Sequence, residues 1–451
     1  MAFLSVKFLI LIIAVLILLK VSGNALMSRL ILIAAGYAFY SCFDLSSSVL
    51  LIVLSVLIWL GGRIINSLRS SGFAGRSRFL CVLFVCLEVG ILCFFKYSGL
   101  FPMPIGLSFY MLQGISFIID SYRGDLAGEY PSLADTLVFI GFFPTIVSGP
   151  IMKAREFIPK LRTQKKLTAD RLSRGIQLFA LGAFMKLVMA DRLAVAVDKV
   201  YSAPLVYSGL TLFFTSIAYT LQLLFDFAGY SNMAIGTACI LGFDLDRNFN
   251  LPYLSSGPSE FWKRWHISLS SWLKDYVYIP LGGSRKGKVR TYLNIFLVMI
   301  ISGLWHGSTV NFLIWGALHG IWQVIHRLIK ESRASSGSSG KPGIISMLLT
   351  FLMVNLLWIP FRAATPYDAW MIFSRMITFK PGAAYYYIYT FIFGGLMLIV
   401  QFIACRRTGR DNPFKALPLG RMYGKIIFCA LIIATAMFAY FGNGAFIYAN
   451  F

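Results

Sequence analysis

Two of the four histidines in this chain lie in an apolar stretch, residues 291–320, that contains no Lys, Arg, Asp or Glu. They are His306, within Trp305-His306-Gly307, and His319. The ring nitrogens of an imidazole need polar partners, so an ionisable residue at membrane depth is a functional-site hypothesis by default. A neutral imidazole, with a pKa near about 6.5, is also suited to accept a proton at cellular pH. His306 is therefore the leading candidate for proton transfer, whereas hydrogen-bonded packing or headgroup contact is expected for His319.

A second histidine-containing segment, residues 257–283, combines a periodic apolar pattern with charged side chains. Pro258 suits the first position of a helix, and large apolar side chains then recur at spacings of four, four, three and four. This pattern predicts one amphipathic helix at or near the membrane interface, with its rings anchored in lipid. His266 falls outside the apolar stripe and is as readily structural as catalytic. The stripe consists of Phe261, Trp265, Leu269, Trp272 and Tyr276.

Asp226 stands among aromatic residues in the sequence "LQLLFDFAGYSNMAIG". A carboxylate in an apolar segment must pair with a cation or with hydrogen-bond donors. The expected partners are Arg264, Lys263 or a histidine. A structural ion pair is favoured over a catalytic role.

The composition requires a membrane protein. Of the 451 residues, 58% are hydrophobic and 13% are charged, and the mean hydropathy is +0.74. A water-soluble domain cannot bury so much apolar surface, and several stretches approach the roughly 20 apolar residues that cross a bilayer. The expected fold class is all-α, integral and polytopic, one domain over residues 1–451 with about 11–12 transmembrane helices. The expected spans are about 4–22, 26–43, 48–62, 79–97, 104–121, 175–196, 208–228, 291–306, 311–327, 344–361, 383–405 and 424–446.

The formal net charge of +23 is concentrated in short loops between apolar runs. This distribution is the positive-inside pattern of membrane proteins, so membrane lipids rather than nucleic acids are expected as partners. Placing the basic loops in the cytoplasm puts both termini outside the cytoplasm. The loops are residues 62–78, 153–174, 282–290, 327–341 and 406–425, and residues 331–343 have the composition of a flexible linker.

Residues 137–157 do not fit a simple span, because Pro144, Gly149 and Pro150 interrupt the apolar sequence. Loops expected in the cytoplasm flank the segment on both sides. Both observations predict a broken or re-entrant segment. Such a segment is tolerated at membrane depth only where protein or a cavity covers the freed backbone groups.

The sequence gives no support for metal chemistry or for a serine nucleophile. The seven cysteines lack metal-ligand spacing and are expected to be buried apolar side chains. The histidines are isolated, with no carboxylate at ligand spacing, so no metal site is predicted. The G-x-S-x-G pattern of a nucleophile elbow is absent.

Several motifs occur together in one order along the chain. This order resembles the membrane-bound O-acyltransferase superfamily, and more closely its bacterial branch, typified by the alginate O-acetylation membrane protein. The likeness covers roughly residues 100–375. The motifs are "PIGLSFYMLQGISFIIDSYRG", "FFPTIVSGPI", Asp226-Phe-Ala-Gly-Tyr-Ser, "NFNLPYLSSGPSEFWKRWHISLSSWLKDYVYIPLGG", "SGLWHG" and "LLWIPFRAATPYDAWMIF".

The resemblance implies a helical fold with re-entrant or interfacial helices around a central funnel through the membrane. An activated acyl group would arrive from the cytoplasm and an acceptor hydroxyl from the other side. The catalytic histidines that it implies are His306 and His266. It implies no bound cofactor, because the acyl thioester, acetyl-CoA or an acyl carrier protein, is a substrate.

Transfer of an acyl group from a thioester to a hydroxyl requires removal of the hydroxyl proton, and His306 is expected as the general base. The tetrahedral intermediate needs hydrogen-bond donors for its developing negative charge. The candidates are Trp305, the backbone N–H groups around Gly307, and Asn311. Asp226 and Arg264 complete the set of candidate substrate-binding residues.

The expected function is transfer of an acyl group, most simply acetyl, across a bacterial plasma membrane. The acceptor would be an extracytoplasmic polysaccharide hydroxyl or a partner acetyltransferase. One alternative is D-alanyl transfer to teichoic acid. A second is a transporter or flippase without acyl chemistry, although no paired half-repeats are found. A third is a membrane scaffold for extracytoplasmic enzymes.

Overall fold

The computed structural model describes residues 3–126, 128–335, 343–385 and 422–440, and residues 391, 394, 395 and 399. These residues are mainly helical, and the β-pairing among them is an isolated bridge between Tyr207 and Ala383. An all-α polytopic fold is thereby confirmed. The chain forms two compact units. One is built from residues up to 179 and from 231–246, and the other from residues 180–230 and from the described residues between 247 and 440.

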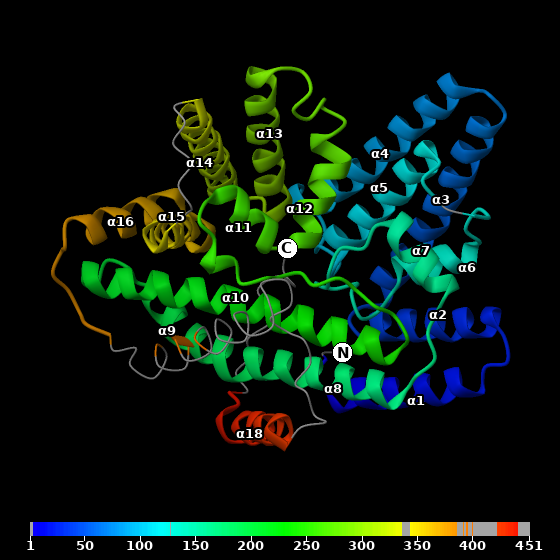
Figure 1. Cartoon of the computed structure of the whole chain (residues 1–451), viewed down its shortest axis with the longest axis horizontal. Helices are drawn as coiled ribbons and strands as arrows, with labels where there is room; N and C mark the ends of the chain where they lie inside the picture. The colour runs from blue at the N-terminus through cyan, green and yellow to red at the C-terminus, as the bar shows by residue number, and fades with distance from the viewer. Residues whose placement is uncertain are drawn as a thin grey trace. The chain divides into compact units, whose positions relative to one another are not determined.

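The first unit begins with helices whose first turns are capped by side chains. Ser5, Asn24 and Asp44 each accept a hydrogen bond from the backbone N–H three residues later. Such caps satisfy N–H groups that have no partner within the helix. Within this unit α3, α4 and α5 pack side by side (Figure 1). Its helices are α1 (Val6–Val21), α2 (Ala25–Ser41), α3 (Leu45–Ser70), α4 (Ala74–Tyr97), α5 (Leu107–Arg123), α6 (Leu133–Ile140) and α7 (Ala154–Arg162).

The interrupted segment between α6 and α7 is non-helical and buried from residue 141 to residue 153. The expectation of a broken segment is therefore confirmed. The first backbone N–H groups of α7 are satisfied by side chains of α5. Ala154 donates to Ser116 Oγ at 3.2 Å, and Arg155 donates to Asp120 Oδ2 at 3.1 Å. Protein thus supplies partners for the N–H groups at which α7 begins after the break.

The second unit contains the helices that carry the candidate site residues. The helices α8 (Ala169–Phe184) and α10 (Gly209–Ile240) contribute residues to both units. The remaining elements of the second unit are the π-helix η1 (Met185–Ala190), α9 (Asp191–Tyr201), the 3₁₀ turn η2 (Pro252–Leu254), α11 (Pro258–Arg264), α12 (Ile267–Leu273), the π-helix η3 (Lys274–Tyr278), α13 (Lys288–His306), α14 (Val310–Ser335), α15 (Ile344–Arg362), α16 (Pro366–Ile377) and α18 (Met422–Phe438).

The helices α13 and α14 form an antiparallel pair (Figure 1). A β-carbon on Gly303 would lie 2.3 Å from the carbonyl oxygen of Phe312, and one on Gly316 would lie 2.5 Å from the carbonyl oxygen of Met299. Neither position has room for a side chain. Small residues at such contacts let membrane helices approach closely, so Gly303 acts in helix packing.

Five helices of the described chain are long and apolar enough to cross a membrane, namely α3, α4, α10, α13 and α15. The expected span 291–306 nearly coincides with α13. The expected span 208–228 is longer in the structure, because α10 continues to Ile240. The expected linker 331–343 is helical through Ser335. Most of that linker's remainder and of the expected span 383–405 lies outside the described residues.

Gly303→Val is expected to destabilise the α13–α14 pair, because a β-carbon cannot fit beside the Phe312 carbonyl. Overpacking a tight contact costs about 1–3 kcal/mol, so the thermal unfolding temperature of the detergent-purified protein should fall clearly. Gly90→Val is the matched control, since a β-carbon there meets nothing within 4 Å. Equal unfolding temperatures for the two variants would contradict the tight contact.

Candidate functional site

His306 is the last residue of α13, and Gly307 continues the chain in an extended conformation. His306 is 1% exposed. Its ring is surrounded by the rings of Trp305, Trp315 and Phe361, whose centroids lie 4.9, 5.1 and 5.4 Å away. Because these rings belong to α13, α14 and α15, three helices determine the surroundings of the candidate base.

Two indoles connect His306 to two other histidines. The Trp305 ring centroid lies 6.1 Å from that of His266 and 4.9 Å from that of His306. The Trp315 ring centroid lies 5.1 Å from that of His306 and 4.9 Å from that of His319. The structure therefore brings both expected catalytic histidines into contact with one indole, although they are far apart in the sequence. We refer to these five residues as the histidine–tryptophan cluster.

His266 lies at a break in the segment that was expected to be one amphipathic helix. Helix α11 ends at Arg264 and α12 begins at Ile267, and His266 between them has φ 43° and ψ 54°. This left-handed conformation is uncommon for a residue other than glycine. The break is stabilised by hydrogen bonds from Ile267 N to Asn248 O at 2.9 Å and from Asn250 N to Arg264 O at 2.9 Å. The continuous-helix prediction is wrong because these tertiary hydrogen bonds replace helical ones.

Asn248 fixes the orientation of the His266 ring. The Asn248 side-chain oxygen accepts hydrogen bonds from the Ser268 backbone N–H at 3.1 Å and the Ser268 hydroxyl at 2.9 Å, and it lies 3.2 Å from His266 Nδ1. Because this oxygen is an acceptor, Nδ1 carries the proton and Nε2 keeps its lone pair. His266 lies outside the long apolar helices, and its burial lowers its pKa to about 3. The ring is therefore neutral at cellular pH.

The apolar stripe of residues 261–276 contacts protein rather than lipid. Its five members are all buried. The Trp265 ring lies 5.7 Å from that of Phe261 and 5.1 Å from that of Trp358 on α15, measured between centroids. The expectation of a lipid anchor is therefore wrong. Helical periodicity identified the buried face correctly but could not tell whether lipid or another helix covers it.

Asp226 pairs with Lys186, a cation that was not among the partners expected from the sequence. Lys186 Nζ lies 2.6 Å from Asp226 Oδ1 and 2.8 Å from Asp191 Oδ1, and all three side chains are nearly fully buried. Lys186 belongs to the π-helix η1, a local distortion that occurs often at functional sites. Sequence reasoning missed Lys186 because it lies inside an expected span. The structure thus shows an ion pair at Asp226, as favoured from the sequence, and the substrate-binding role of Asp226 stays a prediction.

Arg264 and Asn311 both have structural partners. Arg264 Nη2 lies 2.7 Å from Glu260 Oε1, and Arg264 Nη1 donates to the Asn250 carbonyl oxygen at 3.2 Å. Asn311 is 1% exposed and donates through Nδ2 to the Ala363 carbonyl oxygen at 2.7 Å. The buried Asn311 amide retains a second N–H. These contacts define where the two side chains lie and leave their predicted substrate-binding roles as predictions.

His319 differs from the expected hydrogen-bonded packing. It is fully buried, and neither of its ring nitrogens has a hydrogen-bond partner among the residues that the structure describes. Its neighbours are aromatic, with the ring centroid of Trp262 at 5.2 Å and that of Trp322 at 6.0 Å. His319 therefore packs by ring contacts.

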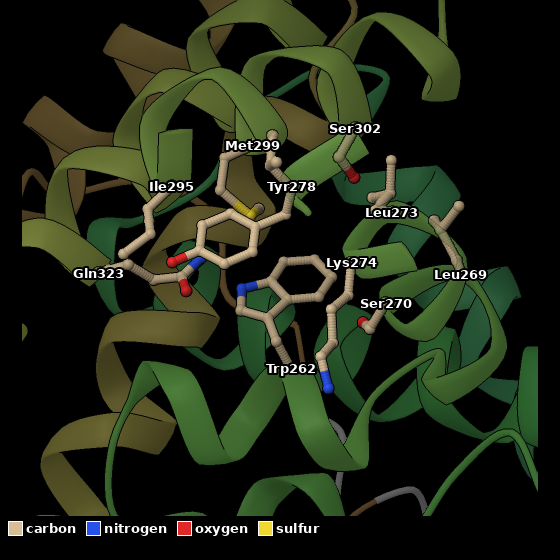
Figure 2. A pocket seen from close by; sticks show the side chains of 11 residues that line it. Trp262, Leu269, Ser270, Leu273, Lys274, Tyr278, Ile295, Met299, Ser302 and Gln323 are labelled. Carbon is tan, nitrogen blue, oxygen red and sulfur yellow. The ribbon is translucent and has the colours of Figure 1, made fainter. Parts of the chain in front are cut away.

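A cavity of about 160 Å³ lies between helices of the second unit (Figure 2). We refer to it as the α13 cavity. Sequence analysis did not single out Ser302. Its position four residues before His306, on the same face of a helix, is the sequence feature that could have identified it. The lining comes from α11, α12, η3, α13 and α14 and includes Trp262, Leu273, Tyr278, Met299, Ser302 and Gln323.

No group of three or more His, Cys, Asp or Glu side chains that could hold a metal ion is found in the described parts of the chain. The polar groups around the cluster are imidazoles, indole N–H groups, amides and a hydroxyl. Such a set is suited to proton transfer and hydrogen bonding.

Comparison with known proteins gives consistent similarities. The family model described as MBOAT, membrane-bound O-acyltransferase family, matches residues 79–337. The probable alginate O-acetylase AlgI of Pseudomonas syringae pv. tomato is 37% identical over 381 residues, covering 78% of this chain and 70% of that protein. The peptidoglycan O-acetyltransferase of Helicobacter pylori is 31% identical over 396 residues, covering 78% and 74%. The teichoic acid D-alanyltransferase of Bacillus subtilis is 30% identical over 238 residues, covering 50% and 60%.

Lys186→Met is expected to destabilise the second unit strongly, because it leaves Asp226 and Asp191 buried without their ammonium partner. Removing one member of a buried ion pair costs about 3–5 kcal/mol, which thermal unfolding in detergent would detect. Arg174→Met is the control, because the Arg174–Asp170 pair is exposed. The triple variant Lys186→Met, Asp191→Asn and Asp226→Asn should recover part of the loss. A loss no larger than that of the control would contradict the structural importance of the pair.

Proposed function

The chain belongs to the membrane-bound O-acyltransferase family and is an acyltransferase, and on this premise we propose that it transfers acetyl groups from a cytoplasmic thioester to an extracytoplasmic acceptor. The acceptor would be a hydroxyl of an exported or cell-wall polysaccharide, or a partner acetyltransferase that modifies the polymer. The relatives named for O-acetylation of alginate and of peptidoglycan support this proposal. Both are matched over 78% of the chain.

D-alanyl transfer to teichoic acid is the second candidate. The relative with this name is matched over 50% of the chain, with 30% identity. The smaller coverage favours acetyl transfer. Transport without acyl chemistry is set aside because the family is one of acyltransferases. A scaffolding role for extracytoplasmic enzymes is compatible with catalysis.

The single observation that carries the proposed mechanism is the contact of both expected histidines with Trp305 in the buried cluster. In this mechanism His306 accepts the proton of the acceptor hydroxyl as its oxygen attacks the thioester carbonyl. The new C–O bond forms, the C–S bond breaks, and the proton passes from His306 to the departing thiolate. His306 is buried among the rings of Trp305, Trp315 and Phe361, so bulk water has little access to it.

His266 would help to position the acceptor hydroxyl and would not accept its proton. Its low pKa and its Nδ1 contact with Asn248 leave Nε2 as a hydrogen-bond acceptor. Such an acceptor can orient a hydroxyl donor. The developing negative charge of the tetrahedral intermediate would be met by Trp305 Nε1, by backbone N–H groups near Gly307 and by the second N–H of Asn311.

The proposed location is a bacterial plasma membrane, with the basic loops in the cytoplasm and both termini outside. The apolar helices support a membrane protein, and the positive-inside pattern supports this orientation. The basic loops would then face the acyl donor, acetyl-CoA or a carrier protein.

His306→Gln is expected to fold and insert normally yet lose acyl transfer by roughly 10²–10⁴-fold, the usual contribution of general acid–base catalysis. Transfer of labelled acetyl to polymer, measured in membranes or with purified protein, checks this. His319→Gln should be much milder. Normal transfer by His306→Gln would remove the proposed base, and an equally severe loss in His319→Gln would reverse the ranking of the two histidines.

Deletion of the gene that encodes this protein is expected to abolish ester-linked acetate on an exported or wall polymer. Polymer is isolated from cells with the gene and from cells without it. Mild base releases the ester-linked acids, and chromatography identifies them. Loss of D-alanine instead of acetate would select the teichoic acid candidate with the same site intact. An unchanged content of both acids would contradict either kind of transfer.

A further inference from the structure

The loop of residues 248–251 is joined to the break between α11 and α12. Ile267 N donates to the Asn248 carbonyl oxygen at 2.9 Å. Leu251, at the end of the loop, has φ 48°, a left-handed value like the φ of 43° at His266. Residues in such conformations persist only where the surrounding structure determines them, and they cluster at functional sites. The loop therefore holds the backbone of His266 in one defined conformation.

The Asn248 side chain presents its oxygen, and not its NH₂ group, to the His266 ring. The same atom lies 3.1 Å from the backbone nitrogen of Ser268 and 3.2 Å from His266 Nδ1. A backbone N–H can only donate a hydrogen bond, so its partner is the acceptor atom of the amide. The Ser268 hydroxyl, at 2.9 Å, donates to this oxygen as well. One amide oxygen thus accepts from three donors, and one of them is the N–H of His266 Nδ1.

The partner of His266 Nδ1 is a neutral amide and not a carboxylate. His266 is 0% exposed, and burial lowers its pKa to about 3. Because the ring is neutral at cellular pH, it carries one proton, and the Asn248 oxygen places that proton on Nδ1. The titratable and charged side chains on the elements packed around His266 include Asp226 paired with Lys186, Glu260 paired with Arg264, Arg247 next to Asn248 in the chain, and His306, which contacts the same indole.

The position of this proton decides what the ring can do for a hydroxyl. A neutral imidazole has one donor nitrogen and one acceptor nitrogen. With the proton on Nδ1, Nε2 accepts a hydrogen bond from a hydroxyl. With the proton on Nε2, the same nitrogen could only donate. In serine hydrolases the wrong histidine tautomer lowers kcat by about 10⁴-fold, so the residue that selects the tautomer has a large effect on the reaction.

We propose that Asn248 is a positioning residue for acyl transfer, which holds His266 in the tautomer with the proton on Nδ1 and, being an amide, keeps the ring uncharged. This assignment rests on the proposed role of His266 in orienting the acceptor hydroxyl. Ser268 fixes the amide oxygen through its backbone N–H and its hydroxyl. A carboxylate in the place of Asn248 would instead favour an imidazolium. The amide therefore reserves proton acceptance for His306.

The first test reads the tautomer directly. The chain has four histidines, so solid-state NMR of the full protein in lipid, labelled with ¹⁵N at histidine, gives few signals. The signals that disappear in His266→Gln belong to His266. Nδ1 of His266 is expected to be protonated and Nε2 unprotonated, and in Asn248→Leu both tautomers should be populated. A proton on Nε2 in the wild type, or an unchanged tautomer in Asn248→Leu, overturns the assignment.

The second test uses Asn248→Asp, which retains an acceptor oxygen and adds a negative charge. A nearby negative charge favours the charged imidazolium, so the pKa of His266 should rise from about 3 toward about 6.5. The ¹⁵N signals of His266 should then show an imidazolium at low pH and the neutral ring as the pH rises. Asn250→Asp is the matched control, because it adds the same charge to the same loop two residues away. An unchanged titration of His266 in Asn248→Asp, or an equal shift in the control, overturns the role of the amide.

The third test measures transfer of labelled acetyl as a function of pH. Asn248→Leu should lower kcat by roughly 10–100-fold, the range found when the outer partner of a metal-bound histidine is removed. For Asn248→Asp the rate is divided by the wild-type rate at each pH, which cancels the titration of groups that both proteins share. This ratio should fall as the pH falls through the raised pKa of His266, because an imidazolium has no acceptor nitrogen. A ratio that does not depend on pH shows a merely structural role and overturns the proposal.

A failure of the proposed function gives a different result. Transfer by His266→Gln at the wild-type rate would remove His266 from the mechanism, and the purpose of Asn248 in transfer with it, although the NMR result would stand. Slow transfer by His266→Gln together with a pH-independent ratio in Asn248→Asp would overturn the role of Asn248 alone. Thermal unfolding in detergent checks that each variant is folded, and Asn248→Asp carries the test if Asn248→Leu does not fold.

Discussion

Gly303 and Gly316, which leave no room for a β-carbon, set the separation of α13 and α14. The site depends on this separation, because His306 ends α13 and packs against Trp315 of α14. The same indole contacts His319, one turn farther along α14. A wider spacing would remove the contact between the rings of His306 and Trp315. Close packing of two helices therefore fixes the surroundings of the base.

The buried Lys186–Asp226 pair has a related consequence for the other histidine. Asp226 is held by Lys186 of the π-helix η1, and the next residue, Phe227, lies 4.7 Å from the ring of His266 between centroids. The ion pair thus fixes α10 at the point where this helix contacts His266. A second carboxylate, Asp191, shares the same ammonium group. Charged groups at this depth are costly unless paired, so the pair holds the helices in one register.

Sequence patterns predicted the features that depend on local periodicity or hydropathy. The span 291–306, the broken segment after α6 and the buried face of residues 261–276 are all found. Features that depend on tertiary contacts were not predictable. The left-handed His266 is stabilised by hydrogen bonds to the loop at residues 248–250. Lys186 was hidden inside an apolar run, so the partner of Asp226 was misassigned. The place of Ser302 in the wall of the α13 cavity likewise depends on the packing of several helices.

The different surroundings of the two catalytic candidates divide their roles. His266 has one nitrogen committed to Asn248 and a pKa lowered to about 3, so it is neutral in the whole cellular pH range. An imidazole of that kind is a poor proton acceptor but a fixed hydrogen-bond acceptor. His306 is packed instead by the rings of Trp305, Trp315 and Phe361. The proposed mechanism therefore assigns proton transfer to His306 and orientation of the acceptor hydroxyl to His266.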